Sequence, residues 1–216
     1  MAKKETEKST QKKESKSEPN ISAFEEIKIG KQIWMAENLN VDRYRNGDEI
    51  PQAKSKKEWI EAFKKGQGAW TYFEGIEANG LVYGRLYNWY AVNDARGLAP
   101  NGFSIPTIEE WLELIEFAGG QPEAGENLKS KKMWTSGNGK DKLSMNILPG
   151  SYRGANGNYD YKLGTNAEFW TSSDLHKGLM TSITEAYDIK FSINPWSEKA
   201  AVTKLGSGLS VRCIKK

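Results

Sequence analysis

The stretch APNGFSIPTIEEW, residues 99–111, places a turn, a short strand and a helix start in direct succession. Its Pro-Asn-Gly run favours a turn, and the following apolar residues predict a short buried strand that ends at Pro106. Thr107 and Glu110 then form a capping box, in which each side chain accepts a hydrogen bond from the backbone amide of the other residue. The stretch therefore predicts a capped helix, with Trp111 pinning it to a sheet as part of the scaffold.

The rest of the pattern predicts an α+β fold with two main helices, short antiparallel strands and long loops. A second capping box at Ser55 and Glu58 begins the other main helix, which ends at Gly66. Short strands are expected within residues 24–39, 68–73, 169–173, 185–193 and 208–216. Residues 81–92 are expected to begin extended and to become helical.

The last of these strands has an alternating pattern. Leu209, Val211 and Cys213 are predicted to face the core, and Ser210 and Arg212 to face solvent.

Composition divides the chain into two parts. Residues 1–22 hold six Lys and four Glu, and we expect a disordered tether there because the segment offers little apolar surface to bury. Residues 23–216 are predicted to form a single domain. Of the whole chain's 31 basic and 28 acidic residues, 25 and 24 belong to this domain, a net charge of +1 that gives no electrostatic basis for binding nucleic acid.

Few residues are available for metal or nucleophilic chemistry. The chain has one Cys and one His, which excludes an intrachain disulfide and a zinc site built on several histidines. No apolar run is long enough to span a membrane, and no signal peptide is recognisable. The protein is therefore expected either in the cytoplasm or outside the cell after loss of a leader.

Several phrases, taken in order, resemble one protein family. They are IGKQIWMAENLN (29–40), YGRLYNWYAV (83–92), APNGFSIPTIEEWLEL (99–114), LPGSYRG (148–154), FWTSS (169–173) and GLSVRCIKK (208–216). The sequence thereby resembles the Fibrobacter succinogenes major paralogous domain family, found mainly in secreted and surface proteins of Bacteroidetes-related bacteria. That family is similar in fold to C-type lectins and to the formylglycine-generating enzyme.

The resemblance implies a C-type-lectin-like fold without the enzyme's activity. Formylglycine-generating enzymes hold copper with a pair of cysteines, whereas this chain has only Cys213, which we interpret as a small buried residue. We therefore expect a protein that is not an enzyme and that needs no cofactor.

Calcium is the one metal for which the sequence offers a candidate. Asn156, Asn158 and Asp160 alternate as in a calcium-binding loop, but the twelfth position of such a loop is Ala167 instead of Glu. A turn rich in Gly and Asn explains the same residues. The triplet Glu-Pro-Asn of mannose-binding lectins occurs at 18–20, within the predicted tether, and is interpreted as chance.

The second half of the chain carries the candidate ligand-binding site, because its loops hold aromatic and polar residues suited to recognition. The candidates are Tyr159, Tyr161, Trp196, Arg153, His176 and Asp174, with Tyr152 and Asn194 in the same loops. Burial of the rings in the core is the competing interpretation.

These observations predict a non-catalytic extracellular or cell-surface module that binds a glycan or a protein. An enzyme with an unrecognised site on the same scaffold, or a purely structural surface domain, are the alternatives. Display at the cell surface or secretion is expected, and a lipid anchor attached through a leader absent from this sequence is left open.

Deletion of residues 1–20 should leave the melting temperature unchanged to within about a degree, because a lysine- and glutamate-rich tether contributes nothing to the core. Thermal unfolding of the full chain and of the truncated chain measures this. A large drop would mean that the segment packs on the domain and that the boundary is wrong.

Overall fold

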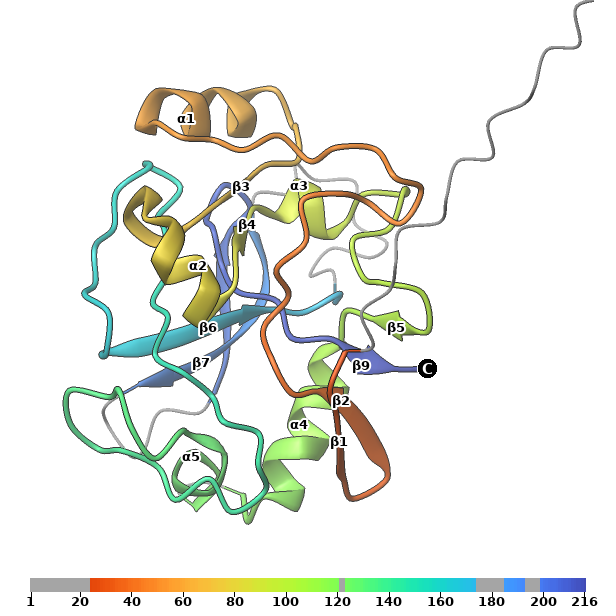
Figure 1. Cartoon of the computed structure of the whole chain (residues 1–216), viewed down its shortest axis with the longest axis vertical. Coiled ribbons are helices and arrows are strands. Elements are labelled where there is room, and N and C mark those ends of the chain that lie inside the picture. Colours follow the sequence, from red (N-terminus) through yellow and green to blue (C-terminus); the bar gives the residue numbers. More distant parts are fainter. Residues whose placement is uncertain (1–23, 121–122, 174–184, 193–198) are drawn as a thin grey trace, which may run out of the picture.

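The computed structural model describes residues 24–120, 123–173, 185–192 and 199–216, and the predicted tether lies outside these ranges. Figure 1 shows the arrangement of the strands and helices. In chain order they are β1 (Glu26–Ile29), β2 (Gln32–Met35), α1 (Lys56–Lys64), β3 (Trp70–Thr71), the 3-10 helix η1 (Phe73–Gly75), α2 (Glu77–Tyr83), β4 (Leu86–Tyr87), α3 (Trp89–Val92), β5 (Phe103–Ser104), α4 (Ile108–Phe117), α5 (Glu123–Leu128), β6 (Asn166–Trp170), β7 (Glu185–Ser192), β8 (Lys199–Lys204) and β9 (Ile214–Lys215).

The described strands form small antiparallel sheets. Their orders are β1-β2-β9-β5, β3-β4 and β6-β7-β8, and every named pair is antiparallel. In Figure 1, β3, β4, β6 and β7 lie in the middle of the molecule, with α1 at one end and α4 and α5 at the other, and the β1–β2 hairpin lies beside α4. The predicted α+β class, with few helices and short antiparallel strands, is confirmed.

Both predicted capping boxes are present. The Ser55 hydroxyl accepts from the Glu58 amide at 3.2 Å, and the Glu58 carboxylate accepts from the Ser55 amide at 2.8 Å. Thr107 and Glu110 repeat this arrangement with the same two distances. Each cap satisfies amides that the first helical turn leaves without partners, which is why these two helix starts were predictable from the sequence.

Trp111 is part of the core, as predicted. Its ring is fully buried, with centroid distances of 4.7 Å to Trp34, 5.3 Å to Phe169 and 6.2 Å to Phe191. Such aromatic pairs contribute about 0.5–1.5 kcal/mol each beyond the burial of their surface. The ring therefore joins α4 to β2 and to the β6–β7 pair, and Trp111 belongs to the scaffold.

The predicted path of residues 81–92 is wrong at its start. This part of the chain is the end of α2, followed by β4 and α3. α2 begins without a side-chain cap and contains Gly80, so the usual helix signals are missing. The glycine is required by packing, because a Cβ atom at Gly80 would lie 2.1 Å from the Tyr72 ring. The strand expected at 68–73 is also shorter, since η1 follows β3 after one residue.

The predicted alternation at the end of the chain is wrong as well. Ser210 and Arg212 are buried, as are Leu209, Val211 and Cys213. The apolar residues of this segment belong to one cluster of the core up to Cys213 and to the other at Ile214. Neighbouring segments bond to its backbone: the Leu39 amide donates to Val211 O and the Trp170 amide to Ser210 O. Alternation fails because neither side of this segment faces water.

Arg212 is the most buried cation described. It is 1% exposed, and its Nε and Nη2 donate to Asn38 Oδ1 at 2.9 and 2.7 Å. Its Nη1 donates to the carbonyl oxygens of Met35, Ala36 and Met145 at 3.2, 2.8 and 3.0 Å. Burial lowers the pKa of the guanidinium to about 10, so the side chain stays charged at neutral pH. Among the described residues no carboxylate forms an ion pair with it.

Arg212→Met should lower the free energy of unfolding by at least about 3 kcal/mol, because it leaves the Asn38 amide oxygen and several carbonyl oxygens buried without donors. Denaturant unfolding measures the change. Arg43→Met is the matched control: Arg43 is 53% exposed and its ion pair with Glu49 is worth about 1 kcal/mol or less. Equal stabilities of the two variants would show that the buried contacts are unimportant.

Candidate functional site

Three of the residues predicted to bind a ligand are described, and their environments differ. Arg153 is 3% exposed, Tyr159 is partly buried and Tyr161 is 46% exposed. They lie on the segment that precedes β6, drawn in cyan in Figure 1, which runs beside α2. The other predicted residues, Trp196, His176, Asp174 and Asn194, lie outside the described residues.

Arg153 and Tyr159 hold this segment against the body of the protein. The Tyr159 hydroxyl donates to Tyr72 O at 3.0 Å, and its ring packs edge-on against Phe73 at 4.9 Å. The Arg153 guanidinium lies 5.0 Å from the ring centroids of both Trp59 and Tyr159, and burial lowers its pKa. The prediction that Arg153 lies on a binding surface is therefore corrected: its cation is enclosed by aromatic rings of the scaffold.

The exposed Tyr161 packs on Tyr152, which is partly buried against the core. We name these two rings, together with Lys190 and the buried Glu168, the tyrosine platform. The two ring centroids are 5.5 Å apart and the ring planes are tilted by 42°. The Lys190 ammonium lies 5.3 Å from the Tyr161 centroid and 5.9 Å from the Tyr152 centroid. It also forms an ion pair with Glu168 at 2.7 Å. The platform thus combines rigid rings with a charged pair at their edge.

Backbone pairing sets the geometry of the platform. The Ser151 amide donates to Asn166 O at 2.8 Å, which places the tyrosine segment alongside β6. The Ser151 hydroxyl donates to Tyr161 O at 3.1 Å and so closes the loop between the two tyrosines. Glu168 and Lys190 lie directly opposite each other in the β6–β7 register, and the Asn166 side-chain amide donates to the same Glu168 oxygen at 2.9 Å.

Sequence reasoning found the tyrosines but missed the charged pair. A signal was available, because Glu168 lies between Ala167 and Phe169 in one apolar strand and Lys190 lies between apolar residues in another. A charged residue in the middle of an apolar strand requires a partner. The sequence does not give the register that pairs these two strands, so the partner could not be named.

The calcium candidates form a hydrogen-bonded turn. Asn156 Oδ1 accepts from the Asn158 amide at 2.9 Å, and Asn158 Oδ1 accepts from the Lys56 ammonium at 2.7 Å. An ammonium group on this oxygen occupies the place that a cation would need. Across the described ranges, no three His, Cys, Asp or Glu side chains gather in a way that could hold a metal ion.

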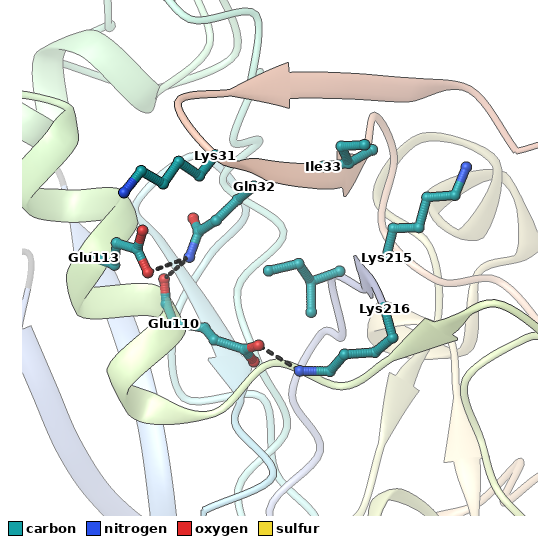
Figure 2. Close-up of a pocket in the computed structure, with 8 residues that line it drawn as sticks. Lys31, Gln32, Ile33, Glu110, Glu113, Lys215 and Lys216 are labelled. Atoms are coloured by element: carbon teal, nitrogen blue, oxygen red, sulfur yellow. Dashed lines mark hydrogen bonds and ion pairs between the residues drawn. The ribbon is translucent and has the colours of Figure 1, made fainter.

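A cleft of about 440 Å³ lies between the β1–β2 turn, the start of α4 and the end of β9, as Figure 2 shows. It is lined by Lys31, Gln32, Ile33, Glu110, Glu113, Ile214, Lys215 and Lys216. Gln32 Nε2 donates to Glu110 O at 2.9 Å, and Lys216 forms an ion pair with the Glu110 carboxylate, which also caps α4. Since these groups already bond to one another, we interpret the cleft as a junction of the hairpin, the helix and the last strand.

The carboxyl groups whose pKa is displaced share one direction. Within the described part of the chain the pKa is lowered for Asp48, Glu58, Asp94, Glu109 and Glu126. The largest displacement is that of Asp94, to about 2, mainly because Arg96 donates hydrogen bonds to it. A general acid at neutral pH needs a raised pKa, so these groups are suited to ion pairs and helix caps.

The fold and the platform together define an α+β protein whose capped helices support an aromatic surface. The chain belongs to the Fibrobacter succinogenes major domain family, whose profile matches residues 27–215. The family resemblance inferred from the sequence phrases is confirmed. No curated protein and no solved structure shows a significant match to the chain. In the described residues, no helix has the length and apolar character needed to cross a membrane.

Addition of calcium should leave the melting temperature unchanged to within about a degree. A ligand that binds the folded state raises stability, but the side-chain oxygens of Asn156 and Asn158 already have donors. Thermal unfolding with added calcium and with a chelator measures this. A calcium-dependent rise in melting temperature that is lost in Asp160→Asn would show that calcium binds to this loop.

Proposed function

We propose that this domain is a non-catalytic recognition module that binds a glycan or protein ligand through the tyrosine platform. The observation that carries the proposal is the exposed Tyr161 ring, packed on Tyr152 and bordered by the Lys190–Glu168 pair. Tyrosine provides a large rigid contact area and loses little conformational entropy on binding. Lys190, whose side chain is partly exposed and is held by the buried Glu168, supplies a hydrogen-bonding group in a fixed position.

The proposal includes a C-type-lectin-like fold and display at the cell surface or secretion. The support for both is the family resemblance, because the family is similar in fold to C-type lectins and is found mainly in secreted and surface proteins. Loops of the second half of lectin-like domains commonly form the recognition face. The platform is built from such a loop together with β6 and β7. Surface proteolysis of intact cells that express the natural gene tests the location.

An enzyme on this scaffold and a purely structural domain are the rival functions. A cluster of buried carboxyl groups with perturbed pKa in a deep pocket would favour the enzyme, whereas the displaced carboxyl groups described above have lowered pKa values and serve ion pairs and helix caps. A structural domain would need no ligand, so an absence of any ligand would favour it.

Tyr161→Ala should weaken ligand binding by about 2 kcal/mol or more while the protein stays folded, since truncation of an exposed hot-spot aromatic has this effect. Glycan and peptide arrays identify the ligand, and calorimetric titration measures the loss. Phe117→Ala is the matched control, because Phe117 is an aromatic residue on α4 with 57% exposure. Equal binding by the two variants would exclude the platform, and an absence of any ligand on both arrays would reject the recognition function.

A further inference from the structure

We infer that this protein associates with a second copy of itself through helix α2 of one copy and the loop after α5 of the other. The first surface is the outer side of α2, where Ala78, Leu81 and Val82 are exposed, Leu81 to 81%. Their spacing of three and four residues places them on one face of the helix, which we name the α2 face. Gly80 and Tyr83, on the other side of the helix, are buried. Exposed apolar side chains gathered in this way are typical of a contact between proteins.

The border of the α2 face is acidic. Glu74 and Glu77 are exposed, and neither forms an ion pair within the described residues. Two copies that packed α2 against α2 would gather four carboxylates in one contact without a cation, which is unfavourable. The predicted tether, residues 1–22, has the opposite charge but too few apolar residues to cover Leu81 and Val82. The partner that fits is basic and presents an exposed apolar side chain.

The loop after α5 has this chemistry. Residues 131–142, which we name the lysine loop, contain four Lys and one Asp. The large apolar side chains that are exposed in the described part of the chain are Ile76, Leu81, Val82, Leu112, Phe117, Met133 and Tyr161. Of these, Met133 alone follows two lysines directly. Lys131, Lys132 and Lys142 are exposed and form no ion pair with any described residue.

The protein holds Met133 in a fixed, outward position. The side chain is 48% exposed, and its backbone has a φ of 75°, which residues other than glycine rarely adopt. The next residue, Trp134, is buried, and its indole donates to Ile147 O at 3.2 Å. The Thr135 amide then donates to Gly164 O at 2.8 Å. Because the loop is already ordered, association through Met133 loses little conformational freedom.

The two surfaces are complementary but do not meet within one copy. In Figure 1 the β6–β7 pair lies between α2 and the loop that follows α5. Contact between copies would place lysines beside Glu74 and Glu77 and would cover Leu81 with Met133, whose flexible side chain adapts to an irregular apolar surface. Such a contact is small and bordered by charge, so we expect it to be weak and to weaken further as salt rises.

Sedimentation velocity of the full chain over a wide range of protein concentration tests this contact. The dissociation constant should rise at least about threefold between roughly 0.05 M and 0.5 M salt. Leu81→Glu and Met133→Glu should each raise it at least about tenfold, because each places a charge in an apolar contact. Leu112→Glu is the matched control: it makes the same change of charge at a leucine on α4 that is 46% exposed, and it should leave association unchanged. Circular dichroism confirms that each variant is folded.

A mixture of the two variants provides the sharper test. The Leu81→Glu chain keeps its lysine loop and the Met133→Glu chain keeps its α2 face, so an equimolar mixture should associate more tightly than either variant alone. A wild-type chain that stays monomeric at every concentration would overturn the inference. A mixture that associates no better than its components, or association that survives either substitution, would do the same. Loss of association on deletion of residues 1–20 would assign the α2 face to the tether instead.

Discussion

The burial of one positive charge constrains this fold more than any other single feature. Arg212 has no carboxylate partner among the described residues, so its charge is stabilised by the Asn38 amide and by carbonyl oxygens of Met35, Ala36 and Met145. Those oxygens come from segments far apart in the sequence, and all must be in place at once. A buried guanidinium with any of them missing would be strongly unfavourable. The cation therefore specifies how the first hairpin, the loop before β6 and the last segment meet.

Local signals predicted the parts of the fold that depend on local contacts. Each capping box is complete within four residues, so Ser55 and Thr107 could be assigned as helix starts from the sequence. The β1–β2 turn depends on a local requirement of the same kind, because Gly30 has the positive φ that favours glycine. The helix α2 was missed since its start has no cap, and the outward assignment of Arg212 failed since its partners lie more than 60 positions away. An alternating apolar and polar pattern shows which residues face solvent only when one side of the strand is in fact exposed to solvent.

In the candidate site, too, the features that depend on local sequence were predicted and those that depend on long-range contacts were not. Its tyrosines were predicted from their place in a loop, whereas the separation into anchoring and exposed rings was not. Tyr159 and Tyr161 are two positions apart, yet one is bonded to Tyr72 O and packs on Phe73 while the other is exposed. The sequence does not state which ring meets the scaffold, because that depends on the contact between this loop and η1. The Glu168–Lys190 pair likewise depends on strand register, which is a property of the assembled sheet.

The central position of the last segment has a consequence for how the protein is made. β9 lies between β2 and β5, and the Leu39 and Met35 amides bond to Val211 and Cys213 in the residues just before it. During synthesis the first hairpin leaves the ribosome long before these partners exist, and one of its edges stays open throughout. Closing so long a loop is slow, and an open strand edge can pair with a neighbouring chain. The four-stranded sheet can therefore form only after β9 has been synthesised, and until then the open edge of the first hairpin needs protection from aggregation.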